Sequence, residues 1–359
     1  MTLNRREFLA ASLASACTLT PLTRAETRAQ DSLDVAFFFV ADTHYLAERR
    51  EPKKLDPRSV QTNAALIDRL NELPGKAIPD AAGGGKAALP RGVIHGGDLI
   101  DTGDKNGPDF LAMQQTEWAG FAADFGLNGK DGRLKYPVYE VHGNHDSPAG
   151  DGLVVKKIIE RNKKRPGLVN VSKNGLHYSW DWKPVHFIAL GIVVGSVPTV
   201  KRKRRYNPLD SLDFLIADLK QNVGDSGRPV VIVHHVDVAR YSTPPDPEGP
   251  ATNKEWDPCD VRGYHDALKA FNVVAILYGH THARNIFHWD GSPRKAQQGV
   301  PVFNVAKSAH FSSKDQAAFY FHLRDEEMIV RELKTSDRWQ TAIWTPQMWK
   351  SKIALKKSR

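Results

Sequence analysis

Residues 35–44 read VAFFFVADTH, an apolar run that breaks off into Asp42, Thr43 and His44. A short run rich in β-branched and aromatic residues predicts a buried strand. Residues two apart in extended backbone point the same way, so Asp42 and His44 can reach one metal ion. This stretch therefore predicts a strand that presents polar ligands at its carboxyl end.

Four further apolar runs, near residues 93, 138, 230 and 276, also end in Asp, Asn or His. The polar residues that follow them are Asp98, Asn144, His145, Asp146, His234, His235, His280 and His282. In open α/β sheets, ligands gather at the carboxyl ends of strands, where loops bring distant positions together. Five such endings predict one shared site.

Each of these residues alone is weak evidence, because a histidine after a strand is more often a structural residue. Their joint occurrence favours a metal centre. A mixture of imidazole, carboxylate and amide ligands favours Zn, Mn or Fe over Ca or Mg. Asp98 is the natural candidate to bridge two cations, which lie about 3.5 to 4 Å apart in sites that hold a phosphoryl group for in-line attack.

Elsewhere the chain alternates strand-like runs with helical or loop segments, which predicts an α/β fold with sizeable sheets. Further strands are expected at 178–182, 185–190, 302–304 and 319–323. Residues 61–73 and 211–219 are the clearest amphipathic helices. Surface loops are expected around the polar insertions at 83–85, 201–205 and 241–250.

The first 29 residues resemble a twin-arginine export signal. Arg5 and Arg6 precede an apolar stretch over residues 10–22, which is shorter than the roughly 20 residues that span a bilayer. Cleavage after Ala25 or Ala29 would leave a periplasmic or secreted protein with no transmembrane segment. We expect a signal at 1–29, one domain at 30–335 and a basic C-terminal extension at 336–359.

The composition, 41% hydrophobic and 25% charged, is that of a globular protein rather than a disordered or fibrous one. Cys17 lies in the expected signal and leaves Cys259 alone, so the mature chain has no intramolecular disulfide. The formal charge of +9 gives weak support for an anionic ligand. We expect the basic residues 201–205 to form a solvated loop, with weak contact to an anionic substrate or membrane surface as the alternative.

Taken in order, these residues resemble the five motifs of the calcineurin-like metallophosphoesterase superfamily. The motifs are Asp42 with His44, Gly97 with Asp98, residues 143–146, His234, and residues 279–282. The resemblance spans roughly residues 35–285 and includes the Leu-rich helix at 211–219. It implies a four-layer α/β/β/α sandwich of two packed mixed sheets, with a dinuclear metal site at the carboxyl ends of the strands.

The resemblance also implies roles for single residues. One metal is bound by Asp42, His44, Asp98 and His282, and the other by Asp98, Asn144, His234 and His280. His145 assists the leaving group, and Asp146 orients the His145 ring. His234 is preferred as the ligand because it directly follows its strand, with His235 as an alternative that faces the substrate or supports the ligands. Asp101 stands where purple acid phosphatases have tyrosine, so no iron-tyrosinate chromophore is expected.

The implied function is that of an exported hydrolase, in which a hydroxide bridging two Mn, Zn or Fe ions attacks a small phosphate mono- or diester. The alternatives are a phospholipid or sphingomyelin-type phosphodiesterase and a non-catalytic metal-binding scaffold; the complete ligand set disfavours the scaffold. Nucleic acid is not an expected partner, because no basic domain with interleaved exposed aromatics is present. We expect Tyr178, Trp180 and Trp182 to pack in the core rather than contact substrate, and the loop at 241–250 to contribute to specificity.

Overall fold

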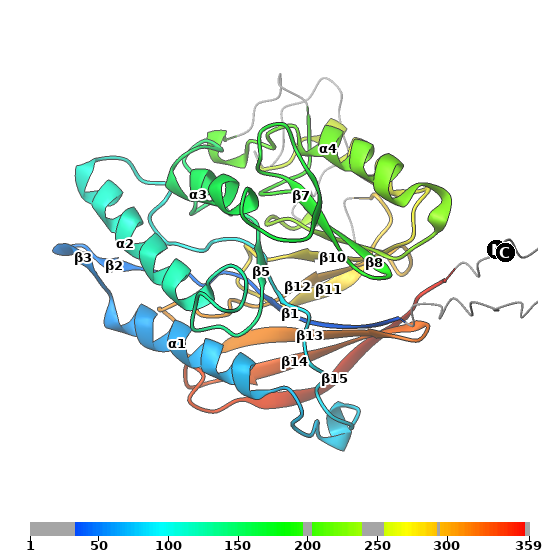
Figure 1. The fold of residues 1–359 in the computed structure, drawn as a ribbon, viewed down its shortest axis with the longest axis horizontal. Helices are drawn as coiled ribbons and strands as arrows, with labels where there is room; N and C mark the ends of the chain where they lie inside the picture. The colour runs from blue at the N-terminus through cyan, green and yellow to red at the C-terminus, as the bar shows by residue number, and fades with distance from the viewer. Residues whose placement is uncertain (1–32, 197–202, 239–254, 293–294, 356–359) are drawn as a thin grey trace, which may run out of the picture. The chain divides into compact units, whose positions relative to one another are not determined.

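The computed structural model describes residues 33–196, 203–238, 255–292 and 295–355, in which two β-sheets pack face to face between helices (Figure 1). The expected signal at 1–29 lies outside the described residues, as do residues 241–250 and part of 201–205. Among the helices in the described ranges, none combines the length and apolar character needed to cross a membrane.

The first sheet has six strands in the order β15-β14-β13-β1-β4-β5. They are β1 (Asp34–Val40), β4 (Val93–His95), β5 (Val138–Glu140), β13 (Gln316–Arg324), β14 (Glu327–Thr335) and β15 (Ile343–Lys352). β1, β4 and β5 are parallel, whereas β13, β14 and β15 continue the sheet in antiparallel pairs. The carboxyl ends of the three parallel strands therefore meet at one edge.

The second sheet has seven strands in the order β11-β12-β10-β9-β8-β7-β6. They are β6 (Leu168–Val171), β7 (Tyr178–Trp182), β8 (Val185–Ala189), β9 (Val230–Val233), β10 (Val273–Tyr278), β11 (Asn285–Trp289) and β12 (Val300–Asn304). The central strands β8, β9, β10 and β12 are parallel. A small hairpin of β2 (Ala47–Glu48) and β3 (Glu51–Leu55) stands apart from both sheets.

β1 shows how the sequence specifies the layers. Phe37 and Phe39 lie in the core between the sheets, where Phe37 stacks on Phe321 with ring centroids 4.8 Å apart. Phe38 and Val40 point the other way and pack with the helices outside the first sheet. A strand buried on both faces is apolar throughout, which is the pattern of residues 35–40.

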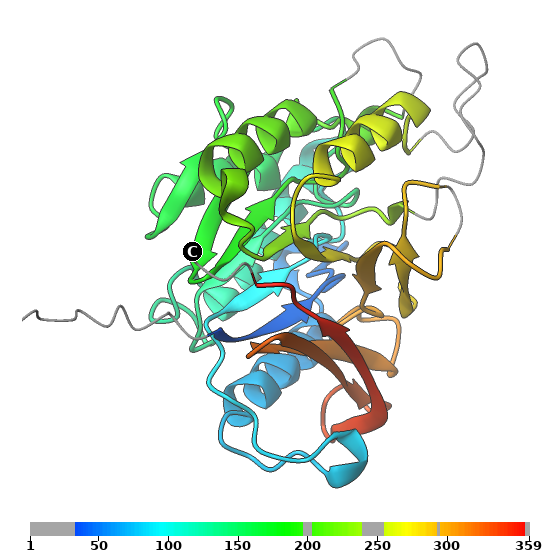
Figure 2. The same cartoon turned by 90° about the vertical axis from the view of Figure 1, so that its right-hand side faces the viewer.

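Helices cover both outer faces of the paired sheets. α1 (Pro57–Glu72), α2 (Pro108–Phe125) and α3 (Leu153–Asn162) pack on the first sheet, and α4 (Ser211–Asp218) and α5 (Pro258–Leu268) on the second. Figure 2 shows α4 and α5 side by side on the outer face. Short helical turns occur at η1 (Asp80–Ala82), η2 (Arg204–Tyr206), η3 (Leu219–Val223) and η4 (Gly224–Ser226). The expected four-layer α/β/β/α arrangement is confirmed.

Every strand expected from the sequence is present, and the two expected helices are α1 and α4. α1 begins at Pro57, earlier than expected, because the Asp56 side chain caps it by accepting the Arg58 N–H at 2.8 Å. α2 was not expected. Its inner face buries Gln114 and Glu117, which interrupt the apolar periodicity that reveals a helix.

The three aromatic residues of β7 pack as expected. Tyr178 and Trp180 are buried between the sheets, and the Trp180 ring stacks on Tyr139 at 4.1 Å. Trp182 is half-buried against Phe187, with ring centroids 4.6 Å apart. These contacts account for the aromatic run as core packing.

The C-terminal segment corrects the domain boundary expected at residue 335. β15 pairs along β14, and the buried Trp339 donates its Nε1–H to the Ser308 carbonyl at 2.7 Å. Residues 336–355 thus complete the first sheet rather than extend beyond it. Lysines on an edge strand protect it from pairing with other chains, which is why this segment resembled a basic tail.

Candidate metal centre

The turns that follow the parallel strands bend sharply to bring polar side chains together. Five of these residues have left-handed backbone: Asp42 (φ 56°), His44 (44°), Asp98 (53°), His280 (73°) and His282 (55°). Non-glycine residues adopt this conformation uncommonly, and functional sites are where such strain collects. The strained backbone at these five positions therefore directs their side chains toward one common point.

Two glycines permit the carboxylates to approach the backbone closely. A Cβ atom on Gly143 would lie 2.2 Å from Asp98 Oδ1, and one on Gly279 would lie 2.5 Å from Asp42 Oδ2. Both distances are far inside van der Waals contact. Glycine is thus required at each position by the neighbouring acid.

A first group of ligand atoms comes from Asp42, His44, Asp98 and His282, all within 4.8 Å of one another. His44 Nε2 lies 3.2 Å from His282 Nε2 and 3.6 Å from Asp98 Oδ2. His282 Nε2 lies 3.4 Å from Asp42 Oδ1. Two imidazoles and two carboxylates around one point suit a transition metal. These are the four residues expected around one metal.

A second group shares Asp98 and adds His235 and His280. His235 Nε2 lies 3.3 Å from Asp98 Oδ2 and 3.1 Å from Asn144 Oδ1. The same Asn144 oxygen lies 2.6 Å from His280 Nδ1. Asp98 Oδ2 therefore faces both groups, as a bridging ligand must.

Three of these histidines are held by their outer ring nitrogen. His44 Nδ1 donates to Asp101 Oδ1 at 3.0 Å, His235 Nδ1 to the Gly96 carbonyl at 2.8 Å, and His280 Nε2 to Glu255 Oε1 at 3.3 Å. Each acceptor is an oxygen, so the proton sits on that outer nitrogen. The inner nitrogen then presents its lone pair to the cluster, which is how metal-binding histidines are oriented. The residues present therefore fit two metal ions.

The structure does not bring His234 into this cluster. Side chains alternate along β9 and beyond it, so Val233 and His235 face the other sheet while His234 faces the helices. Its ring lies among aromatic residues, 5.6 Å from both Trp256 and Tyr264. Burial lowers the pKa of His234 to about 3, so the ring is neutral there. We reassign the expected ligand position from His234 to His235.

Asp98 and His235 balance one another electrostatically. Burial disfavours the charged form of each, but their mutual attraction lowers the pKa of Asp98 well below its usual value and raises the pKa of His235 to about 9. In the metal-free protein this attraction favours a proton on His235 Nε2, the nitrogen that presents its lone pair to the cluster when the ring is neutral. His235 must release that proton to act as a ligand.

His145 lies at the edge of the first group. Its ring centroid is 4.8 Å from that of His44, and its Nδ1 donates to the Asp101 carbonyl at 3.0 Å. Burial opposes protonation, but the charge of Asp98 and this hydrogen bond raise the pKa of His145 above its usual value. The ring is therefore oriented by the Asp101 backbone, with Nε2 left for a ligand.

Asp146 has a different task from the one expected. Its carboxylate accepts three backbone N–H groups, from Leu99 and Ile100 at 3.0 Å and from Gly143 at 2.7 Å. Burial and the nearby Asp98 raise the pKa of Asp146 to about 7. Asp146 thus joins the turn after β4 to the turn after β5, and the expectation that it orients the His145 ring is corrected.

Sequence reasoning missed three residues beside the cluster. Asp101 and Glu255 orient His44 and His280, and the His310 ring lies 4.4 Å from that of His44. The sequence analysis considered Asp101 only because purple acid phosphatases have a tyrosine at this position. Its place three residues after Asp98 could have indicated a residue that supports the site. Glu255 lies just before α5 and His310 several residues after β12, so neither directly follows a strand and the sequence alone offers no comparable signal.

The two-sheet α/β sandwich with carboxylate and imidazole side chains gathered at the carboxyl ends of its strands is the arrangement that the resemblance to metallophosphoesterases implied. Residues 35–284 match the family described as calcineurin-like phosphoesterase. The chain belongs to this family and is a hydrolase that acts on phosphoric ester bonds. No curated protein sequence matches it significantly.

Two solved structures have a similar fold. A dimetal phosphatase from Danio rerio superposes with a TM-score of 0.54 and 13% identity, over 88% of this chain and 99% of its own. The structure of PhoD superposes with a TM-score of 0.51 and 12% identity, over 89% of this chain and 70% of its own. At these identities the likeness shows a shared fold and nothing about the substrate.

Proposed function

We propose that this chain is an exported phosphoesterase that binds two transition-metal ions and hydrolyses a small phosphate mono- or diester. One observation carries the proposal: Asp98 Oδ2 lies 3.6 Å from His44 Nε2 and 3.3 Å from His235 Nε2, between two groups of ligand atoms. A shared carboxylate of this kind holds two cations side by side. The donor set suits Mn, Zn or Fe.

Metal ions in the two groups would neutralise phosphate charge and activate a water molecule for attack on phosphorus. The first group consists of Asp42, His44, Asp98 and His282, and the second of Asp98, Asn144, His235 and His280. The hydrogen bonds from Asp101, Gly96 and Glu255 hold the imidazoles in place before a substrate arrives. Preorganised ligands of this kind reduce the reorganisation that the reaction requires.

His145 is the residue that we assign to the leaving group. Its Nδ1 is bound to the Asp101 carbonyl, and its backbone N–H is bound to Asp98 Oδ1 at 2.8 Å. These two contacts fix the ring next to the first group and leave Nε2 as the donor. A proton or hydrogen bond from Nε2 would stabilise the departing oxygen.

Hydrolysis is tested by reconstituting metal-free protein separately with Mn, Zn and Fe and offering aryl and alkyl monoesters and a diester. We expect turnover with at least one metal and none without metal. Asp98→Asn should abolish turnover, whereas Asp266→Asn, on an exposed carboxylate far along α5, should not. Folded, metal-loaded protein that hydrolyses none of the esters would favour the non-catalytic scaffold instead.

Export is supported by the sequence of residues 1–29 alone. Changing Arg5 and Arg6 together to Lys should leave unprocessed protein in the cytoplasm, because the paired arginines are what the export pathway recognises. The matched change of Arg24 and Arg28 to Lys should be processed normally. Cell fractionation would refute the twin-arginine route if the first variant were exported as well as the second.

A further inference from the structure

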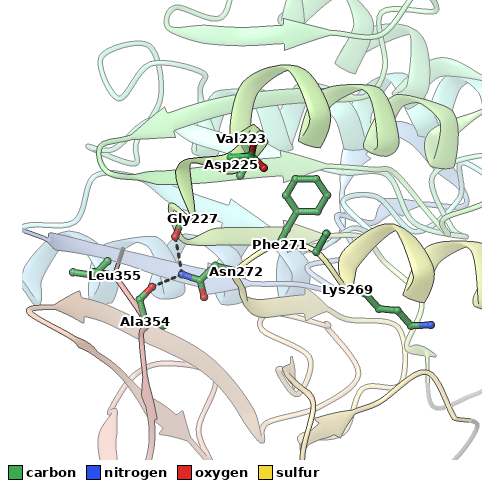
Figure 3. Close-up of a pocket in the computed structure, with 10 residues that line it drawn as sticks. Val223, Asp225, Gly227, Lys269, Phe271, Asn272, Ala354 and Leu355 are labelled. Carbon is green, nitrogen blue, oxygen red and sulfur yellow. Dashed lines mark hydrogen bonds between the residues drawn. The ribbon is translucent and has the colours of Figure 1, made fainter. Parts of the chain in front are cut away.

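Two cavities of about 320 Å³ lie at opposite ends of the paired sheets. One is at the amino ends of β9 and β10, where the Asn272 amide donates to the Gly227 and Ala354 carbonyls (Figure 3). Residues on the strands' other ends form the metal centre, so this cavity is remote from it. The second cavity adjoins the metal centre, because His282 lines it.

Charged side chains line the second cavity at positions that continue the apolar layer between the two sheets. Glu332 and Lys334 on β14 are paired in register with Phe319 and Ala317 on β13, and both partners lie in the core between the sheets. Directly paired residues share a face of the sheet. The apolar layer between the sheets therefore gives way to Glu332 and Lys334 at the edge beside His282.

One of the acids in this cavity is already neutralised. Glu332 is 2% exposed and accepts the Arg284 Nη1–H at 2.7 Å. The Arg284 guanidinium is further held over the Trp349 ring, 5.4 Å from its centroid. A buried carboxylate requires such a partner, so this pair is a fixed part of the wall.

Two lysines and one further acid determine the remaining charge of the cavity. Lys334 comes from β14 and Lys307 from the loop after β12, where the Lys307 carbonyl accepts the Ala317 N–H at 3.3 Å. Within the described residues, neither lysine has a carboxylate within 4.0 Å of its Nζ. The lining also holds Asp315, which is exposed to solvent, as is Lys334. Three basic side chains, Arg284, Lys307 and Lys334, thus face two acids, so the cavity has an excess of one positive charge and opens beside His282.

We propose that this cavity binds a second anionic group, a carboxylate or a phosphate, of the ester whose scissile phosphate lies at the metal centre. The inference rests on the proposed function and names its substrate class. Lysine ammonium groups act as point charges with rotatable donors, so they accept either anion. Substrates with a second negative group would then bind more tightly than neutral-tailed esters.

The test is calorimetric binding to the metal-loaded protein of three phosphonates that differ only in their second group. Methylphosphonate carries none, phosphonoacetate carries a carboxylate and methylenediphosphonate carries a second phosphonate. We expect the wild type to bind phosphonoacetate, methylenediphosphonate or both more tightly than methylphosphonate. Lys307→Ala and Lys334→Ala should each reduce that preference roughly tenfold, the size of one charge-assisted hydrogen bond.

Lys314→Ala is the matched control, because Lys314 is an exposed lysine on the same loop that does not line the cavity. It should leave both the preference and the ester hydrolysis unchanged. Metal content measured before and after each titration shows whether a phosphonate has extracted metal. Equal affinity for all three phosphonates, or a preference that survives both substitutions, would overturn the proposal. Absence of hydrolysis together with a lysine-dependent preference would instead refute the proposed function and leave the anion site standing.

Discussion

The carboxylate of Asp98 is oriented by a hydrogen bond to one of its two oxygens. Oδ1 accepts the His145 backbone N–H at 2.8 Å, whereas Oδ2 faces His44 and His235. Because Oδ1 is tied to the backbone, the direction of Oδ2 is set before any ligand binds. The shared ligand is therefore as well oriented as the histidines around it.

The two adjacent histidines after β9 should respond differently to truncation. His235→Ala removes a ligand, so we expect it to lose metal from the second group. His234→Ala should keep full metal stoichiometry but lower the free energy of unfolding by about 2 to 5 kcal/mol, because it opens a cavity among Trp256 and Tyr264. Elemental analysis and urea unfolding of both variants measure these effects. Metal loss from His234→Ala alone would restore the assignment made from the sequence.

Substitution of His145 should distinguish an effect on catalysis from an effect on metal binding. His145→Ala should retain both metals yet lose about 100- to 10,000-fold in turnover, which is the usual range for general acid catalysis. An aryl ester departs with little protonation, so its hydrolysis should suffer less than that of an alkyl ester. Metal loss from this variant would place His145 with His44 and Asp101, whose atoms also gather within 4.8 Å. Equal defects on both esters would mean that His145 stabilises phosphoryl charge instead.

At the scale of elements, polar side chains join strands and helices far from the metal centre. His186 on β8 lies between two carboxylates, with Nδ1 2.8 Å from Asp181 on β7 and Nε2 2.7 Å from Asp218 at the end of α4. Burial favours the neutral ring, but both acids raise the pKa of His186 above its usual 6.5. This contact connects α4 to the sheet that it covers.

The stability that His186 contributes should depend on pH. Its folded-state pKa is raised, so the contribution is fully present below pH 6.5 and is lost as the pH rises through the folded value. His186→Gln should therefore lower the free energy of unfolding by about 1.5 to 3 kcal/mol at pH 6, because Asp218 Oδ2 loses its charged partner, and by less at pH 9. Asp218 Oδ1 keeps its hydrogen bonds from Asn170, Ser179 and Asn222. Urea unfolding at the two pH values, with His288→Gln as control, measures the difference. An equal loss at both values would show that His186 acts by packing alone.

The elements differ in how well the sequence reveals them. Residues 35–40 and 230–233 are buried on both faces, so their apolar runs identify them as strands without knowledge of the fold. α2 is hidden because Glu117 on its inner face accepts the N–H groups of Ala47 and Thr102. A buried polar side chain that supports a loop looks like a surface residue in the sequence.

The same distinction holds within the site. Asp42, His44, Asp98, Asn144, His280 and His282 follow strand ends directly, so their convergence was predictable from the parallel order of the strands. The choice between His234 and His235 depends on which way β9 faces, which the alternation of Val231 and Val233 reveals only once the layers are known. Glu255 lies just before α5 and His310 several residues after β12, so neither follows a strand end directly and sequence spacing does not reveal them.

At the scale of the whole molecule, the candidate metal centre joins the two sheets. Asp42, Asp98 and Asn144 follow strands of the first sheet, whereas His235, His280 and His282 follow strands of the second. Each group of ligand atoms therefore takes residues from both sheets. Metal binding should stabilise the sandwich as a unit, because ions that bind only the folded state shift the unfolding equilibrium.

The most direct measurement is the number of metal ions bound per chain. Protein reconstituted with excess Mn or Zn, desalted and analysed for metal and protein should hold two ions per chain. Asp98→Ala should lose metal from both groups at once, because the bridging carboxylate belongs to each. A wild type that binds at most one ion per chain, with a weaker second site excluded by titration, would contradict the two-metal account.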